Sequence, residues 1–233
     1  MSSNLLLKYL NNRLVENGSH KKPEDLKPKP VITISREVGC NGVKLAHMLA
    51  DSLNNKNPAA QWKVISKEVF FESARELNMS PEQLRKTLSQ REKFHFEEII
   101  KAFNDKKYKS GPTIAKTTRE VIMHFATNGY CIIVGRAGNI IAKDLKTALH
   151  IRLTAPLDYR IKTIMDNNGL TRENAIRFIN QVEEERKAFR ESVLGAKIHD
   201  EMFDIMLNRG VFSNEKIVEL IEFAAEKKGI FSF

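Results

Sequence analysis

From residue 31 onward, five short runs of apolar, β-branched and aromatic residues alternate with longer segments whose apolar residues recur at helical spacing. The runs occupy residues 31–35, 62–65, 130–134, 149–153 and 203–207. Such alternation is typical of a parallel sheet, because parallel neighbours need a crossover connection and the crossover helices cover both faces. The sequence therefore predicts an α/β fold of three layers, with a five-stranded parallel sheet between helices.

Several of the helical segments have recognisable ends. Leucine recurs every fourth residue between Leu45 and Leu53, which predicts a helix with one buried face. Gly129 and Gly169 stand where a glycine commonly ends a helix, and Ser213 is a good N-cap residue for the last helix. These signals predict that helices fill the intervals between the strands.

Three segments differ in character. Residues 1–30 read as an N-terminal appendage and linker, because a short amphipathic stretch is followed by charged residues punctuated by prolines. Residues 31–233 are predicted to form one domain. Within it, residues 67–128 form a long, charged and mostly helical insertion between the second and third strands. We expect this insertion to project beyond the sheet and to provide an acceptor-binding subdomain.

The segment from Ser35 to Lys44 leads from the first strand into the first helix. A strand–turn–helix passage presents consecutive backbone N–H groups at a helix N-terminus, which favours an anion. Gly39 and Gly42 let the backbone bend without Cβ collisions, and Arg36 adds positive charge. Composition alone leaves a phosphate site and a plain turn equally open. The turn also departs from the loop G-x-x-x-x-G-K-[ST], because Gly42 stands where that loop has lysine.

Composition and charge exclude several classes of protein. The formal net charge of +9 is compatible with nucleic acid, an acidic membrane surface or small phosphorylated ligands, but the sequence has no RNP-like strand or zinc-finger spacing, so nucleic-acid binding is not expected. The apolar runs are far shorter than the roughly 20 residues of a membrane span. The N-terminus lacks the apolar core of a signal peptide, so a cytoplasmic location is expected. Two cysteines and scattered histidines predict no protein-bound metal site.

A second stretch, residues 130–161, has the order strand, Gly-Arg, helix, strand and Ala-Pro-x-x-x-Arg. Together with Ser35, Arg36, Gly39 and Gly42 in the first turn, it resembles the cytidylate kinase-like family, whose phosphate loop reads S-R-x-x-G-x-G-G. The resemblance extends from residue 31 to the C-terminus and implies the P-loop kinase fold, with a lysine-free loop as a family trait. Asn41 replaces a family glycine, and asparagine tolerates a left-handed backbone well.

The resemblance assigns residues to two substrates, ATP and a nucleoside monophosphate. The residues assigned to ATP are Ser35, Arg36, Gly39, Cys40, Asn41, Gly42, Val43 and Lys44. Those assigned to the acceptor are Glu68, Gly135 and Arg136. Ala137 stands where cytidylate kinases have an aspartate after Gly-Arg, and Ser66 precedes Glu68 where an acid is usual. Base specificity therefore stays open.

Residues 156–193 resemble the helix–lid–helix element of nucleoside monophosphate kinases, in which arginines close over the phosphates. The resemblance implies catalytic roles for Arg160, Arg186 and Arg190, beside Arg36. The two arginines at 186 and 190 share one helix face. Spacing alone favours a solvated charged helix, because three glutamates directly precede Arg186, and only the family placement reverses this interpretation.

The resemblance thus implies a nucleoside monophosphate kinase that moves the γ-phosphoryl group of ATP to CMP, dCMP or a related small phosphoacceptor. Such transfer depends on alignment and charge neutralisation, so no general base is needed. Mg²⁺ would be held mainly by phosphates and water, with no protein ligand expected. Two alternatives remain: a nucleotide-binding regulatory protein with weak or no activity, and a kinase for another small phosphoacceptor. The sequence leaves open whether the chain is a monomer or a homo-oligomer.

Overall fold

In the computed structural model the chain is described over residues 29–67, 112–197, 199 and 202–231. Glu68, most of the predicted insertion and nearly all of the N-terminal appendage lie outside the described residues. The elements are β1 (Val31–Arg36), α2 (Gly42–Lys56), β2 (Lys63–Ile65), α6 (Pro112–Asn128), β3 (Cys131–Val134), α7 (Gly138–Ile141), β4 (Ala148–Thr154), α8 (Leu157–Asn168), α9 (Arg172–Leu194), β5 (Ile205–Asn208) and α10 (Asn214–Lys227).

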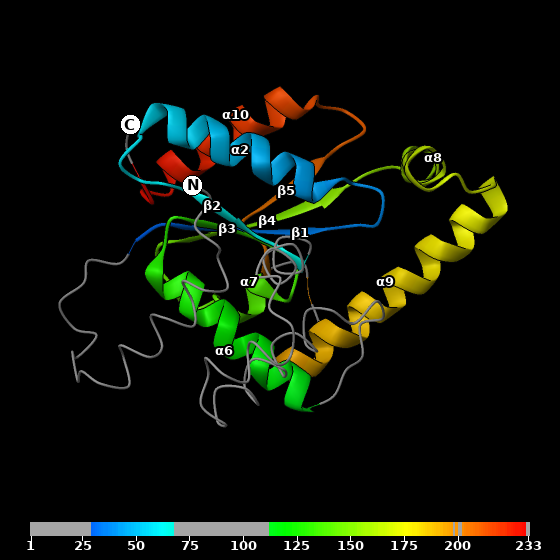
Figure 1. Ribbon diagram of the computed structural model, residues 1–233, viewed down its shortest axis with the longest axis horizontal. Coiled ribbons are helices and arrows are strands. Elements are labelled where there is room, and N and C mark those ends of the chain that lie inside the picture. The colour runs from blue at the N-terminus through cyan, green and yellow to red at the C-terminus, as the bar shows by residue number, and fades with distance from the viewer. Residues whose placement is uncertain (1–28, 68–111, 198, 200–201, 232–233) are drawn as a thin grey trace, which may run out of the picture.

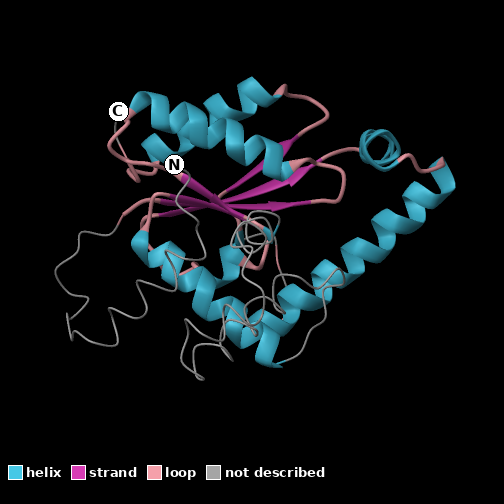
Figure 2. Cartoon of the chain, in the orientation of Figure 1, coloured by secondary structure: helices cyan, strands magenta, loops and turns pink. Residues whose placement is uncertain are grey.

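The five strands form one sheet in the order β2-β3-β1-β4-β5, and every neighbouring pair is parallel. Val31 at the start of β1 pairs with Cys131 on one side and Ala148 on the other. Because all strands run the same way, their carboxyl ends meet at one edge, where open α/β sheets bind ligands. The predicted fold class, a five-stranded parallel sheet with helices on both faces, is confirmed (Figures 1 and 2).

Helices α2 and α10 cover one face of the sheet, above it in Figure 1. The strand residues that point toward these helices are aliphatic, and they pack against leucine and isoleucine side chains of the helices. The fully buried members of this core include Ile32, Ile34, Leu45, Leu49, Leu53, Ile217 and Ile221. The leucine repeat predicted a buried helix face, and the structure confirms it.

Helices α6, α7 and α9 cover the opposite face, below the sheet in Figure 1. Near the strand starts this face is apolar, with Val31, Ile133 and Phe189 in one buried cluster. Toward the carboxyl ends it becomes polar, because Thr33 and Ser35 alternate with the isoleucines of β1 and are themselves buried. The polar edge of the sheet is therefore confined to one face and one end.

Helices α8 and α9 pack against each other, cross at a steep angle in Figure 1 and occupy the predicted lid region. Helix α8 ends at Gly169, which has a left-handed backbone, and the Thr171 side chain caps α9 by accepting a hydrogen bond from the Asn174 amide. The Ser213 side chain caps α10 in the same manner. The ends at Gly169 and Ser213 match those predicted from the sequence, whereas the Thr171 cap was not predicted. Among the helices that the structure describes, none has the length and apolar character needed to cross a membrane.

Candidate functional site

The turn between β1 and α2 lies at the carboxyl edge of the sheet. Gly39 has φ +93°, and Asn41 has φ 45° and ψ 41°, in the left-handed region that the sequence predicted for it. A Cβ added at Gly39 would lie 2.8 Å from the backbone of Arg160, so only glycine allows α8 to approach the turn this closely. The N-terminus of α2 thus opens directly from a turn with the shape expected of a phosphate loop.

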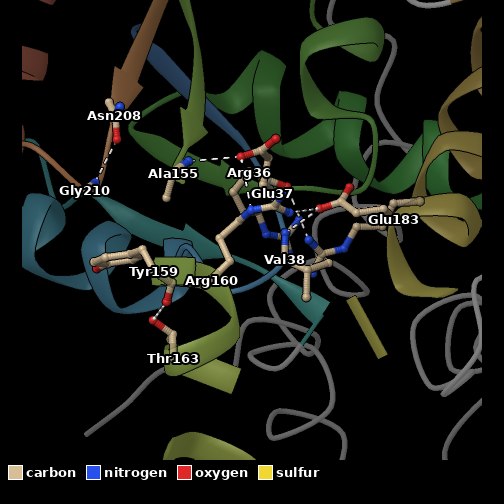
Figure 3. A network of polar contacts seen from close by, with 11 residues as sticks. Arg36, Glu37, Val38, Ala155, Tyr159, Arg160, Thr163, Glu183, Asn208 and Gly210 are labelled. Carbon is tan, nitrogen blue, oxygen red and sulfur yellow. Dashed lines mark hydrogen bonds and ion pairs between the residues drawn. The ribbon is translucent and has the colours of Figure 1, made fainter. Parts of the chain in front are cut away.

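A network of carboxylates and Arg160 fastens the helix pair α8–α9 to the turn (Figure 3). The Val38 amide donates a hydrogen bond to Glu183 Oε1 at 2.5 Å, and the Ala155 amide donates one to Glu37 Oε2 at 3.0 Å. Arg160 lies between the two carboxylates, 3.6 Å from that of Glu37 and 3.7 Å from that of Glu183. One amide of the turn therefore binds an anion, and the anion is a side chain of α9.

A small pocket lies beside the turn, between the carboxyl ends of β1 and β3 and helix α9. Four of the predicted arginines line it: Arg36, Arg136, Arg186 and Arg190. They come from three separate parts of the chain and converge only in the folded protein. No Asp or Glu belongs to the lining residues that the structure describes. Guanidinium groups suit the planar, delocalised oxygens of phosphate, so the pocket has the chemistry of a phosphate site.

The turn after β3 places Arg136 in this pocket. Gly135, Arg136 and Ala137 have φ values of +74°, +51° and +55°, three successive left-handed residues of which two carry a Cβ. Non-glycine residues in this region cost roughly 1–3 kcal/mol each and cluster at functional sites. Arg136 is 5% exposed and its guanidinium lies over the Phe189 ring at 5.8 Å. The strained turn and the aromatic ring fix the direction of this arginine.

Arg36 spans the pocket. A Cβ added at Gly135 would lie 1.9 Å from Arg36 Nη1, and one added at Gly42 would lie 3.2 Å from its Cγ. The Arg36 carbonyl accepts a hydrogen bond from Arg186 Nη1 at 3.2 Å. The remaining cavity, about 20 Å³, is room for roughly one water molecule. A bound nucleotide would therefore require the Arg36 side chain to move.

Burial and like charges lower the pKa of Arg190. The largest cause is burial, followed by the positive charge of Arg152, while Glu183 acts in the opposite direction. Burial, assisted by the Glu37 carboxylate, raises the pKa of the Cys40 thiol to about 11, so this thiol is neutral at physiological pH. Cys40 belongs to the apolar core under α2, and only its backbone faces the turn.

The remaining predicted residues lie in different places. Ser35 lines the pocket, whereas the side chains of Val43 and Lys44 do not, and Lys44 is exposed on the first turn of α2. Arg160 also does not line the pocket, because Glu37 and Glu183 hold it on the other side of the turn. The sequence therefore grouped residues that the fold separates: some line the pocket, whereas Arg160 pairs with Glu37 and Glu183 and joins α8 and α9 to the turn.

Sequence reasoning missed several residues of the site. Asn139 lines the pocket and is 3% exposed, and Glu183 binds the turn although it read as part of a solvated charged face. Arg152, on β4, acts electrostatically on Arg190 of α9. A signal existed for Arg152, since a charged residue inside an otherwise apolar parallel strand is rare. No comparable local signal marks Glu183, because its partner is 145 residues away.

The donor set of the pocket suits phosphate oxygens and not a metal ion. Among the described residues there is no group of three or more His, Cys, Asp or Glu side chains that could hold a metal. Phosphate groups of a nucleotide would meet arginines, backbone amides and the hydroxyls of Thr33 and Ser35.

Comparison with known proteins places this geometry in context. The sequence model of the cytidylate kinase-like family matches residues 31–211. A comparison with curated proteins gave no match. Among solved structures, an uncharacterized protein from Eubacterium ventriosum is similar with a TM-score of 0.60 at 20% identity, over 85% of this chain and 99% of that one. Shikimate kinase from Bacteroides thetaiotaomicron has a TM-score of 0.46 at 14% identity, over 84% of this chain and 98% of that one.

Proposed function

Since this chain belongs to the cytidylate kinase-like family, we propose that it is a nucleoside monophosphate kinase, with ATP as phosphoryl donor and CMP or dCMP as the first acceptor to test. The observation that carries the proposal is the convergence of Arg36, Arg136, Arg186 and Arg190 on one pocket beside a phosphate-loop-like turn. The proposal places the protein in the cytoplasm, where both nucleotides are available.

The turn and the pocket beside it offer donors for the phosphates of a triphosphate and of a monophosphate, once the Arg36 side chain moves to make room. The turn and the N-terminus of α2 offer backbone N–H groups, and Gly39 and Gly42 have no Cβ of their own to cover the turn. ATP with Mg²⁺ would supply the transferable phosphoryl group there. The pocket next to the turn would take the acceptor, with Arg136 directed into it by its left-handed backbone.

The arginines would act by position and charge. Arg36 replaces the missing lysine as the cation nearest the turn, and Arg186 contacts both the pocket and the Arg36 carbonyl. Charge that develops between the two phosphates would thus meet the guanidinium groups of the pocket, once Arg36 has moved to admit the nucleotide. Such charge stabilisation is the largest contribution that a protein makes to phosphoryl transfer. An acceptor phosphate is itself a nucleophile, so no side chain has to remove a proton.

Arg160 has a different proposed role from the catalytic one that the resemblance implied. Its two carboxylate partners, 3.6 and 3.7 Å away, hold α8 and α9 against the turn. Buried apolar contacts support the same docking, since Val38 packs with Ile161 and Ile179. We propose that Arg160 positions the helix pair, so that Arg186 and Arg190 on α9 reach the pocket.

A coupled phosphotransfer assay with ATP, Mg²⁺ and a panel of nucleoside monophosphates tests the proposal. We expect turnover with CMP or dCMP and a loss of about 100-fold in kcat/KM for Arg136→Gln, because a preorganised charged contact is removed. The matched control is Arg177→Gln. Arg177 lies on α9, its side chain is 69% exposed, and among the described residues it pairs with Glu173 alone. Turnover on no monophosphate of the panel would contradict the proposal.

A second candidate is a nucleotide-binding regulatory protein without transfer activity. It is favoured by one observation: no lysine belongs to the described lining of the pocket, and Lys44 points elsewhere. Isothermal titration that detects ATP binding to a protein with no turnover would support this candidate. Such a result would agree with a nucleotide-binding site and would exclude phosphoryl transfer to the acceptors tested.

A further inference from the structure

Strand β4 carries two ionisable side chains on a face where apolar residues are expected. Leu149, Ile151 and Leu153 belong to the core beneath α2 and α10, so alternation directs His150 and Arg152 to the opposite face. The structure accounts for His150, whose Nδ1 lies 2.8 Å from Thr33 Oγ1. For Arg152, the residues that the structure describes provide no such hydrogen bond, only the aromatic ring of Phe203.

Arg152 lies on the strand next to a residue that lines the arginine pocket. Its backbone pairs in register with Ser35, a residue that lines the pocket and points to the same face of the sheet. The guanidinium lies 5.5 Å from the centre of the Phe203 ring. Among the described residues, no carboxylate forms an ion pair or hydrogen bond with Arg152.

Arg190 brings a second positive charge to the same place. It lines the pocket, its Nε is buried without a hydrogen-bond partner, and the charge of Arg152 contributes to its lowered pKa. Glu183 offsets the effect of the Arg152 charge on Arg190 only in part, because the Glu183 carboxylate already interacts with the Val38 amide and Arg160. Two arginines that repel each other with little compensation are unfavourable, and an anion between them would remove the cost.

We propose that Arg152 and Arg190 form an anion subsite on the β4 side of the pocket, which holds the phosphate of the acceptor. The inference rests on the proposed function and deepens it, because it names the residues that would hold the phosphate of the acceptor whatever base the acceptor carries. Arg136, from the turn after β3, would then face the rest of the acceptor. A dianionic phosphate matches two neighbouring guanidinium forks, whereas an uncharged hydroxyl acceptor would leave both charges uncompensated.

Thermal unfolding of the full chain with inorganic phosphate tests the subsite, with sodium chloride at equal ionic strength as the reference. We expect phosphate to raise the Tm of the wild type, and Arg152→Gln to reduce this rise to less than about half. Arg177→Gln should keep the full rise. Without phosphate, the Tm of Arg152→Gln should equal or exceed that of the wild type, because one of two like charges is gone.

Two further variants keep the test decisive. Arg152→Lys retains the charge without the planar fork and should keep more of the phosphate effect than Arg152→Gln. If Arg152→Gln does not fold, Arg190→Gln serves as the test variant in its place. An undiminished phosphate effect in these variants would overturn the subsite.

The outcome can be separated from that of the proposed function. A phosphate effect that depends on Arg152, in a protein that phosphorylates no monophosphate, would support the subsite and refute the kinase. Turnover on CMP with an unchanged KM in Arg152→Gln would support the kinase and refute the subsite.

Discussion

The two faces of the sheet use alternate residues of the same strands for different purposes. On the face beneath α2 and α10, β1 contributes Ile32 and Ile34, both 0% exposed. On the face beneath α9, the same strand contributes Thr33 and Ser35, which are nearly as buried but line a pocket of arginines. Burial is thus similar on the two faces, and the kind of partner differs. One face supplies hydrophobic stability, and the other carries the positive charge that we propose binds phosphate.

Strand β4 repeats the contrast. Its aliphatic residues pack into the core under α2 and α10, whereas His150 and Arg152 face the pocket side. A protein built for stability alone would place aliphatic residues on both faces of a central parallel strand. Retaining a partly buried cation such as Arg152 there is costly unless an anion compensates it. The comparison shows that the apolar face serves packing, whereas the charge on the polar face agrees with the anion site proposed above.

The largest expected effect is on the apolar face. Leu49→Ala removes a fully buried side chain from the core under α2 and should lower the free energy of unfolding by about 2–5 kcal/mol. Ser35→Ala, at a site almost as buried on the polar face, should change it by about 1 kcal/mol or less. Denaturant unfolding measures both. Equal losses for the two variants would erase the contrast between the faces.

The next effect concerns the turn after β3. Gly135→Ala and Gly195→Ala both place a Cβ on a left-handed backbone, at φ +74° and +76°, which costs about 1–2 kcal/mol each. Only at Gly135 would the Cβ also meet Arg36 Nη1, 1.9 Å away, whereas nothing lies within 4 Å at Gly195.

Gly135→Ala should therefore displace Arg36 and weaken nucleotide binding, while Gly195→Ala should lose stability alone. Calorimetric titration with ATP, alongside unfolding experiments, distinguishes the two variants. If both variants bound ATP as the wild type does, the assigned position of Arg36 would be wrong.

The smallest effect is a pH dependence on the polar face. Burial lowers the pKa of His150 below its usual 6.5, although Asp204 opposes the shift. The unfolded chain then binds more protons than the folded one in this range, so stability is complete above pH 6.5 and falls as the pH drops through the lower folded pKa. The contribution of Asp204 lies in a more acidic window, because its own pKa is lowered from 3.8.

His150→Gln should flatten this dependence between pH 6.5 and the acidic window. Thermal unfolding across that range in wild type and variant measures the difference. A slope that is unchanged in His150→Gln would show that another group titrates with folding.

Local signals predicted the framework of the fold well. Each of the five apolar runs became a strand, and Gly169 and Ser213 mark helix ends where the sequence placed them. The left-handed backbone of Asn41 was also predictable, since it depends on one residue type in one turn. Such features depend on neighbours in the chain, which a sequence displays directly.

The members of the site were predictable only in part. The resemblance led to Arg36, Arg136, Arg186 and Arg190, and the structure brings these four together. It also led to Arg160, which the fold places between Glu37 and Glu183 on the outer side of the turn. The difference arises because an arginine's partners depend on which helix face meets the turn, and the sequence does not show that contact.

The sequence by itself determined the alternation of strands and helices, the position of the turn and the supply of arginines, because hydrophobic period and turn chemistry act over a few residues. The tertiary structure decided which arginines share a pocket and which are fastened to carboxylates. It also brought Arg152 beside Arg190, since residues on different elements become neighbours only when the sheet and α9 pack together. The sequence shows which residues carry charge, but whether a charge meets an opposite charge depends on distances that only the folded structure sets.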